Sequence, residues 1–287
     1  MVERRADNAE VGGSTPPPPT SGVSAETSAN GLLDEVESRP VQGWDFGWLG
    51  DRVSSTALPW RFEEIVLRHA RPSPDLLDLG TGGGEWLAAL AHRPPRTVAT
   101  EAWPPNVDVA GARLRPLAIT VVWVEPAPDN VEQRTDERRG RLPFPSDSFS
   151  LVSSRHESFL ASEVARVLEP GGTFVTQQIG GDYGDYYDAL GLPRVRPRRP
   201  PWDMSLAAQQ LDAAGLQVVD GRDGIEETSF ADVGAFAWYL KAIPWIVEGF
   251  SITAHRPHLE RLHERIEAGG SVTMRQPAFW IQAVKDS

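Results

Sequence analysis

The stretch Asp75-Leu-Leu-Asp-Leu-Gly-Thr-Gly-Gly-Gly-Glu85 is a short apolar run followed directly by four glycines in five residues. The apolar run predicts a buried strand over 76–79, and the residues from Glu85 to His92 predict a helix. A glycine-rich turn between a strand and a helix lets backbone N–H groups approach a ligand closely, because glycine has no Cβ. The stretch therefore predicts a ligand-binding turn at the carboxyl end of a buried strand.

An acidic residue follows this turn at an informative distance. The segment Thr97-Val-Ala-Thr-Glu101 predicts the next strand, and its terminal carboxylate comes 23 residues after Asp78. A carboxylate about 20 residues beyond such a turn is placed to accept hydrogen bonds from ribose hydroxyls. The turn and the acid together indicate a cofactor that contains a nucleoside.

The glycine spacing discriminates between nucleoside cofactors. The dinucleotide fingerprint requires glycine at the sixth position from Gly80, but this position is Glu85, whose carboxylate is unfavourable beside a pyrophosphate. The chain instead carries Asp-x-Gly-x-Gly-x-Gly, which resembles the first motif of class I S-adenosylmethionine-dependent methyltransferases. The resemblance implies S-adenosylmethionine as cofactor, bound by Asp78, Gly80, Thr81, Gly82, Gly84, Glu101 and Ala102.

Two later segments extend the resemblance over roughly residues 75–220. Leu142-Pro-Phe-Pro-Ser-Asp-Ser-Phe-Ser-Leu-Val152 is similar to the family's segment before its fourth strand, and Ala165-Arg-Val-Leu-Glu-Pro-Gly-Gly-Thr-Phe174 is similar to the turn before its fifth. The chain departs from the family at Ser150, where aspartate is usual. The acid that contacts adenine in the family is not assigned here, and three candidates stay open: Asp129, Asn130 and Asp136.

The order of predicted elements defines the fold class. Strands alternating with helices predict an α/β three-layer sandwich with a seven-stranded, mostly parallel, doubly wound sheet. The resemblance implies that the last strand, 278–284, is antiparallel. The predicted segments are a disordered Pro/Ser/Thr-rich tail (1–38), an N-terminal cap (39–72), a cofactor-binding core (73–220), a substrate-side insertion (221–276) and the last strand (277–287).

Composition excludes several classes of partner and site. The net charge of −12 and a pI near 5.0 argue against nucleic acid as the main partner. The chain has no cysteine, which excludes disulfides and thiolate metal sites, and it has no apolar run long enough to cross a bilayer. We expect a cytoplasmic protein with a small-molecule partner, no membrane contact and no metal. The oligomeric state is not predicted.

The residues after the predicted fourth strand are the catalytic candidates. His156 is the candidate base, because the pKa of histidine lies near neutral pH, and Glu157 is a candidate to orient it or to bind a substrate amine. The alternative is that His156 packs beneath the cofactor or caps the next helix. Gln177 and Gln178, at the end of the fifth strand, are candidates for the same cleft or for a structural role.

Three aromatic groups lie outside the predicted sheet, at positions where family members cover the acceptor. They are Trp44, Phe46 and Trp48; Tyr183, Tyr186 and Tyr187; and Trp238, Tyr239 and Trp245. Aromatic walls suit an aromatic or apolar small molecule, although such residues also form ordinary core. The basic run 192–199 is either a solvated loop or an anion-attracting loop beside the acceptor.

The sequence therefore predicts methyl transfer from S-adenosylmethionine to an oxygen or nitrogen of a small molecule, with aromatic acceptors as candidates. Two alternatives remain: a non-catalytic S-adenosylmethionine-binding protein, and a nucleotide-dependent oxidoreductase.

Overall fold

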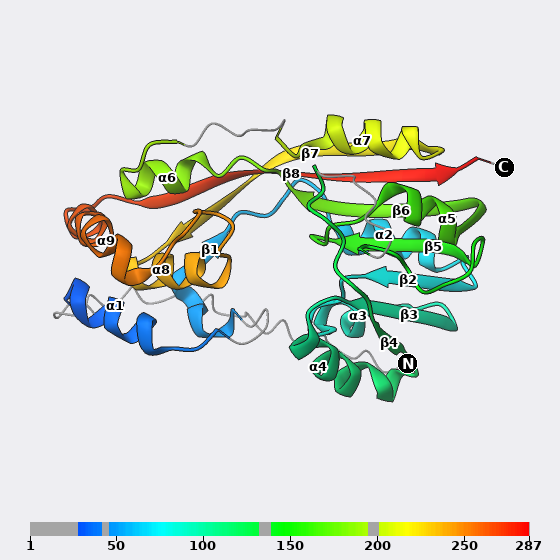
Figure 1. The fold of residues 1–287 in the computed structure, drawn as a ribbon, viewed down its shortest axis with the longest axis horizontal. Coiled ribbons are helices and arrows are strands. Elements are labelled where there is room, and N and C mark those ends of the chain that lie inside the picture. The colour runs from blue at the N-terminus through cyan, green and yellow to red at the C-terminus, as the bar shows by residue number, and fades with distance from the viewer. Residues whose placement is uncertain (1–27, 42–45, 132–138, 195–200, 287) are drawn as a thin grey trace, which may run out of the picture.

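The computed structural model describes residues 28–41, 46–131, 139–194 and 201–286. Its centre is an eight-stranded sheet in the order β1-β7-β8-β6-β5-β2-β3-β4 (Figure 1). The strands are β1 (Val53–Ser55), β2 (Asp75–Leu79), β3 (Arg96–Glu101), β4 (Thr120–Trp123), β5 (Phe149–Arg155), β6 (Leu168–Ile179), β7 (Leu216–Phe230) and β8 (Val272–Lys285). The predicted sheet lacked β1, a three-residue strand that pairs with β7 at one edge.

The strand directions confirm the predicted doubly wound arrangement. Strands β2 to β6 run parallel, and β2 lies between β3 and β5, so the strand order reverses at β2. The predicted antiparallel last strand is confirmed, because β8 runs antiparallel to both β6 and β7. In this type of sheet, ligands bind beyond the carboxyl ends of the strands at which the strand order reverses. In this protein these are the carboxyl ends of β2 and β5.

Helices cover both faces of the parallel strands and give the predicted three layers. Leu76 and Leu77 point to opposite faces, and each belongs to a different hydrophobic core. One face is covered by α2 (Phe62–Ala70), α3 (Glu85–Ala89) and α4 (Pro104–Leu114), and the other by α5 (Ala161–Val167) and α7 (Met204–Ala213). We refer to this part as the sandwich.

A second lobe surrounds the far halves of β7 and β8, which run out of the sandwich together (Figure 1). Its helices are α1 (Ala29–Ser38), α6 (Gly184–Leu190), α8 (Val233–Ala242) and α9 (Ile252–Glu267), and the 3₁₀ segment η1 (Gly47–Arg52) joins them. Phe230, Val272 and Met274 from the two strands are buried among these elements. The second lobe therefore has its own core, and two continuous strands connect it to the sandwich.

Helix α1 corrects the predicted extent of the disordered tail. The Ser28 hydroxyl caps the helix by accepting a hydrogen bond from the N–H of Gly31 at 3.3 Å. Leu33 and Val36 lie on one face of the helix and are fully buried in the second lobe. The polar composition of 1–38 concealed this short amphipathic segment, so the predicted boundary at 38 is wrong. Residues 1–27 lie outside the described residues.

Other element boundaries also differ from the prediction. The predicted insertion 221–276 begins inside β7, and β8 begins at Val272 rather than 278. Helix α4 begins at Pro104, and proline fits the first turn of a helix because its missing N–H has no partner there. No helix in the described ranges is long and apolar enough to span a membrane.

Candidate functional site

The glycine-rich turn between β2 and α3 requires glycine at several positions. Gly80, Gly82 and Gly84 have φ values of 66°, 61° and 82°, in the left-handed region that other residues rarely adopt. A Cβ added at Gly84 would lie 2.9 Å from Cγ of Leu114 on α4. The N–H of Thr81 donates to the carbonyl of Thr100 on the neighbouring strand at 2.9 Å. The turn is therefore fixed against the end of β3.

Glu101 lies at that end and is only 4% exposed. Its Oε2 accepts a hydrogen bond from the N–H of Gly82 at 2.7 Å, and its Oε1 accepts one from the N–H of Trp103 at 2.9 Å. Burial raises the pKa of this carboxyl, although these backbone donors favour the ionised form. A carboxylate has about four acceptor positions, so the contacts leave room for two hydroxyl donors of a ribose.

Asp78 supports the turn from inside the sheet. Its carboxylate is 2% exposed and accepts a hydrogen bond from the Ser153 hydroxyl on β5 at 2.7 Å. Burial raises its pKa to about 6. This residue therefore connects the two strands at the switch point rather than presenting its side chain to solvent.

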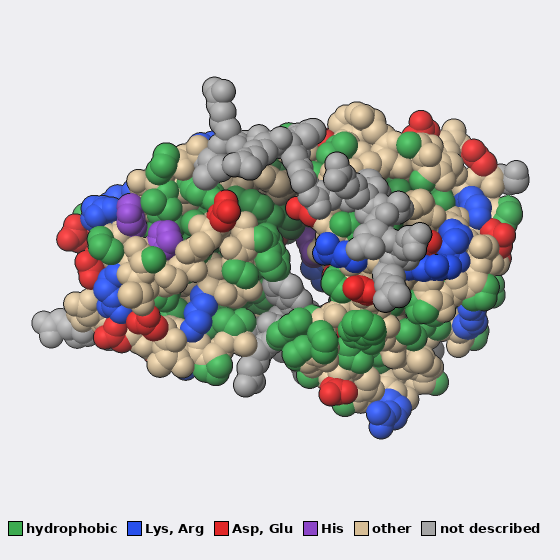
Figure 2. Space-filling model, viewed as in Figure 1, with side chains coloured by type: hydrophobic (Ala, Val, Ile, Leu, Met, Phe, Trp, Pro, Cys, Tyr) green, Lys and Arg blue, Asp and Glu red, His purple; other side chains and the backbone are tan. Residues whose placement is uncertain are grey.

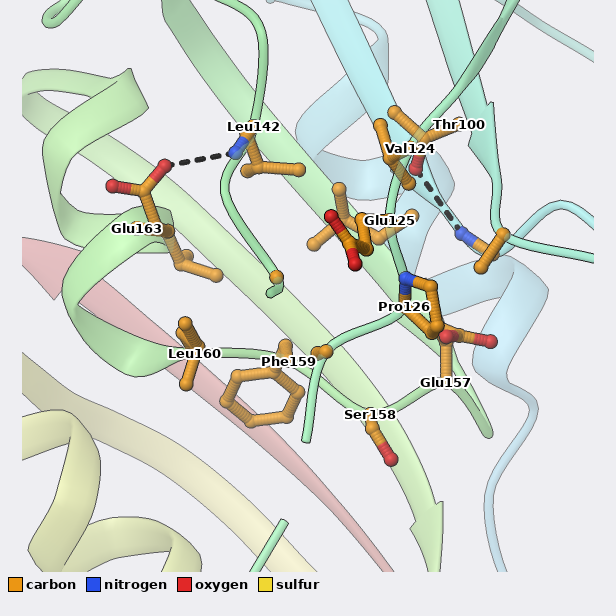
Figure 3. A pocket seen from close by; sticks show the side chains of 16 residues that line it. Thr100, Val124, Glu125, Pro126, Leu142, Glu157, Ser158, Phe159, Leu160 and Glu163 are labelled. Carbon is orange, nitrogen blue, oxygen red and sulfur yellow. Dashed lines mark hydrogen bonds between the residues drawn. The ribbon is translucent and has the colours of Figure 1, made fainter. Parts of the chain in front are cut away.

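A small cavity of about 30 Å³ adjoins the turn, with Glu125, Pro126 and Glu157 among its walls (Figure 3). Gly80, Thr100 and Ala102 line it from the ends of β2 and β3. The cavity lies between the ends of β2 and β3 and the segment after β4.

The open adenine-contact candidates are not in the walls of this cavity. Asn130 is buried elsewhere, where its Oδ1 accepts the N–H of Phe159 at 3.1 Å. Asp129 is exposed and accepts the N–H of Val131 at 3.1 Å, while Asp136 lies outside the described residues. Among the acids that do line the cavity is Glu125, which follows β4 and was not predicted from the sequence. Its position two residues after Trp123, the last residue of β4, was an available signal.

Glu157 lies directly against the glycine turn. A Cβ added at Gly80 would overlap the Glu157 side chain, so the two residues are in close contact. Burial, followed by the negative charge of Glu101, raises the pKa of Glu157 to about 7. Two carboxyl groups that repel each other thus flank the turn, and a bound cation would relieve this repulsion.

His156 is held by a hydrogen-bonded chain that fixes its tautomer. Trp60 Nε1–H donates to Gln177 Oε1 at 2.8 Å, and because indole can only donate, this contact fixes the orientation of the amide. The Gln177 Nε2 group therefore faces His156 Nε2, at 3.1 Å, and donates to it. Nε2 is then the acceptor nitrogen, so the proton of the neutral ring is on Nδ1.

The surroundings of His156 also weaken it as a base. Solvent reaches the residue, yet desolvation by the surrounding protein, together with the charge of Arg155, lowers its pKa to about 3. His156 adopts a φ of 64°, and its N–H donates to the carbonyl of Gln177 at 2.8 Å. Gln177, and not Glu157, orients the ring. Because Nε2 already accepts a hydrogen bond from Gln177, the neutral ring has no free acceptor nitrogen in this arrangement, and the base role of His156 stays a prediction.

The predicted aromatic groups mostly meet in the core of the second lobe. Phe46 packs edge-to-face on Trp238 with centroids 5.6 Å apart, and Tyr186 stacks on Tyr239 at 6.2 Å. Trp245 is exposed, and Trp44 lies outside the described residues. In the basic run, Arg194 donates to Asp188 at 3.0 Å, and residues 195–199 are not described.

A second cavity, of about 260 Å³, lies between the η1–β1 segment and the β7–α8 segment. Its walls are Phe46, Leu49, Gly50, Val53, Ser55, Glu226, Thr228 and Tyr239. Arg155, at the end of β5, interacts electrostatically with both Asp78 and Glu226. Strands β7 and β8 continue past the carboxyl end of β6, so the second cavity lies beyond the same edge of the sheet as the glycine turn, and Figure 2 shows a hollow in the surface between the sandwich and the second lobe.

Comparison with known proteins identifies the central part of the sandwich. The family model described as a methyltransferase domain matches residues 77–176, which include β2, the acid Glu101 and the segment after β5. These residues form a methyltransferase domain. The chain therefore carries a methyltransferase domain with S-adenosylmethionine as its cofactor, and the matched residues include the glycine turn and Glu101.

Two solved structures share the methyltransferase fold with this chain. A protein of Bacillus halodurans C-125, assigned as a methyltransferase, has a TM-score of 0.53 and 17% identity, covering 79% of this chain and 99% of its own. The YcgJ protein of Bacillus subtilis has a TM-score of 0.51 and 17% identity, covering 79% of this chain and 98% of its own. A search of curated proteins finds no significant match.

Proposed function

We propose that this methyltransferase acts on an oxygen or nitrogen atom of a small molecule bound in the second cavity. The observation that carries this proposal is that β7 and β8 continue past the carboxyl end of β6, so Glu226 and Thr228 of the second cavity lie beyond the sheet edge that carries the glycine turn. The electrostatic interaction of Arg155 with both Asp78 and Glu226 agrees with this arrangement. Methyl transfer requires the nucleophile to lie in line with the methyl group and the sulfur. The acceptor site must therefore lie beside the cofactor site.

The residues around the turn fit the chemistry of the cofactor. Glu101 retains acceptor capacity for ribose hydroxyls, and Glu157 adds a second carboxyl group beside the turn, which favours a cationic ligand. The small cavity of about 30 Å³ has to enlarge to admit an adenosine. We propose that the side chains of Glu125 and Glu157 move apart on binding, with Ala102 lying against the base.

S-adenosylmethionine supplies a methyl group whose carbon forms a bond to the acceptor lone pair while the carbon–sulfur electron pair stays on sulfur. A hydroxyl or amine acceptor then also loses a proton. In our proposal Glu157 accepts this proton, because a pKa of about 7 suits proton transfer near neutral pH. In this proposal His156, whose Nε2 accepts a hydrogen bond from Gln177, does not act as the base.

A labelling experiment tests the proposed function. The full chain is incubated with S-adenosylmethionine labelled in its methyl group and a small-molecule extract of the source organism, and labelled products are identified by mass spectrometry. We expect a labelled small molecule that disappears in the Gly82→Val variant. Label that appears only in protein or nucleic acid would contradict a small-molecule acceptor. The predicted cytoplasmic location remains a prediction.

A further inference from the structure

Glu226 is a carboxylate that faces the second cavity without a hydrogen-bonding partner in the described part of the chain. It lies on β7 opposite Gln276 of β8, and it is half-buried. Burial raises its pKa, and Arg155 is the only described charge that opposes this effect. Burying a carboxylate costs free energy unless the group is paired. Glu226 is therefore suited to pair with a hydrogen-bond donor or a cation of a ligand.

The cations near this cavity are already engaged. Arg52 Nε donates to Asp232 Oδ2 at 2.7 Å, and its guanidinium stacks on Trp48 at 4.5 Å. Lys241 donates to three backbone carbonyls near the end of α1, at 2.6 to 3.0 Å. Among the described residues this leaves Arg155, which interacts with Glu226 through space but lies beyond ion-pair distance.

The walls around Glu226 suit the body of an aromatic amine. Phe46 and Tyr239 place two aromatic rings in the walls, with centroids 5.8 Å apart, and Leu49 and Val53 complete the apolar surface. Aromatic faces attract ammonium groups through the ring quadrupole and also pack against other rings. At about 260 Å³ the cavity is slightly below the usual range for drug-sized ligands, which is about 300–1,000 Å³.

We propose that the acceptor is an aromatic amine whose ammonium group pairs with Glu226 while its ring packs against Phe46 and Tyr239. This inference rests on the proposed function, because it takes the second cavity as the acceptor site. An ion-paired ammonium has no free lone pair and is not a nucleophile. The nitrogen held by Glu226 is therefore an anchor, and the methyl group goes to a different atom of the same molecule.

Two probes that differ only in charge test the anchor. The full chain is titrated by calorimetry with 2-phenylethylamine and with 2-phenylethanol, which has nearly the same shape and carries no charge at pH 7. We expect the amine to bind at least tenfold more tightly than the alcohol. Equal affinities, or no measurable binding of the amine, would overturn the inference.

Variants at neighbouring positions of β7 assign the effect to one side chain. Glu226→Gln should reduce amine binding at least tenfold and leave alcohol binding unchanged. Glu227→Gln is the matched control, because Glu227 points to the opposite face of the strand and pairs with Arg275 at 3.3 Å. Glu227→Gln should change neither affinity, and an unchanged amine affinity in Glu226→Gln would refute the anchor. Circular dichroism confirms that both variants are folded.

A third titration separates this inference from the function on which it rests. S-adenosylhomocysteine is added to the same wild-type sample. Binding of this compound without a preference for the amine would overturn the aromatic-amine inference and leave the methyltransferase assignment intact. Failure of S-adenosylhomocysteine to bind would instead count against the proposed function.

Discussion

The N–H of Gly82 donates a hydrogen bond to Oε2 of Glu101 at 2.7 Å, which joins the glycine turn to the acid at the end of β3. The turn after β2 and the acid at the end of β3 are thus held together by a hydrogen bond within the protein itself. Glu101→Ala removes this contact and the proposed ribose ligand together. We expect the affinity for S-adenosylmethionine to fall by about 1–3 kcal/mol, the scale of a lost charge-assisted hydrogen bond.

Calorimetric titration measures this change, with Glu64→Ala as control. Glu64 is an exposed carboxylate on α2 that pairs only with Arg61 and lies away from the turn. The control should bind like the wild type. A loss of less than about 0.3 kcal/mol in Glu101→Ala would remove this residue as the ribose ligand.

Gly82→Val should abolish measurable cofactor binding. The residue has a φ of 61°, and a β-branched side chain strongly disfavours this conformation. Gly111→Ala in α4 is the contrasting variant, because nothing lies within 4 Å of its added Cβ. That variant should bind normally and gain about 0.5–1 kcal/mol of stability from helix propensity. Normal cofactor affinity in Gly82→Val would contradict the assigned turn.

The ionisation of Glu157 should make the free energy of unfolding depend on pH. The pKa of Glu157 is about 7 in the folded protein, against an ordinary value of 4.5, so the folded state binds more protons between these pH values. The free energy of unfolding should therefore fall as pH rises from about 4.5 to 7, and stay lowered above pH 7. Asp78, with a pKa of about 6, acts in the same direction.

Glu157→Gln removes this contribution because it cannot ionise. At pH 8 we expect the variant to be more stable than the wild type by about 1–3 kcal/mol, and at pH 4.5 we expect little difference. Urea denaturation at the two pH values measures the change. A variant that is less stable than the wild type at pH 8 would show that Glu157 is ionised and well paired in the fold.

His156 should remain neutral throughout the physiological range. The donor contact from Gln177 and the low pKa of about 3 predict a ring protonated on Nδ1 only, from pH 5 to pH 8. Nitrogen NMR shifts of the labelled ring distinguish the two tautomers and the charged form. A titration midpoint near 6.5 would contradict this description and restore the histidine as a candidate base.

Leu33→Ala tests the place of α1 in the second lobe. Leu33 is fully buried, and removing a buried leucine side chain costs about 2–5 kcal/mol because it leaves a cavity. Glu35→Ala on the same helix is the control, since its exposed contact with Arg39 contributes less than about 0.5 kcal/mol. Equal unfolding free energies for the two variants would show that α1 does not pack as described.

The glycine turn after β2 and the acid at the end of β3 were predictable because their signals are local. The turn and the acid are short motifs at a fixed separation, and backbone geometry determines what they do. The three layers followed from the alternation of elements, and the antiparallel last strand from the family resemblance. Glu125 was missed because its one signal, a position two residues beyond β4, is weaker than a motif of fixed spacing.

Contacts between distant segments were not predictable in the same way. The hydrogen bond between Trp60 and Gln177 joins residues 117 positions apart, and it changes the expected chemistry of His156. No local pattern encodes this contact. Helix α1 was missed for a related reason, since Leu33 and Val36 gain their stability from packing against a lobe that only the tertiary fold creates.

The most direct test of the cofactor assignment is a crystal structure of the full chain with S-adenosylhomocysteine. We expect both ribose hydroxyls within hydrogen-bond distance of the Glu101 carboxylate, with adenine in an enlarged cavity between Ala102 and Glu125. A ligand bound elsewhere, or a ribose that makes no contact with Glu101, would contradict it.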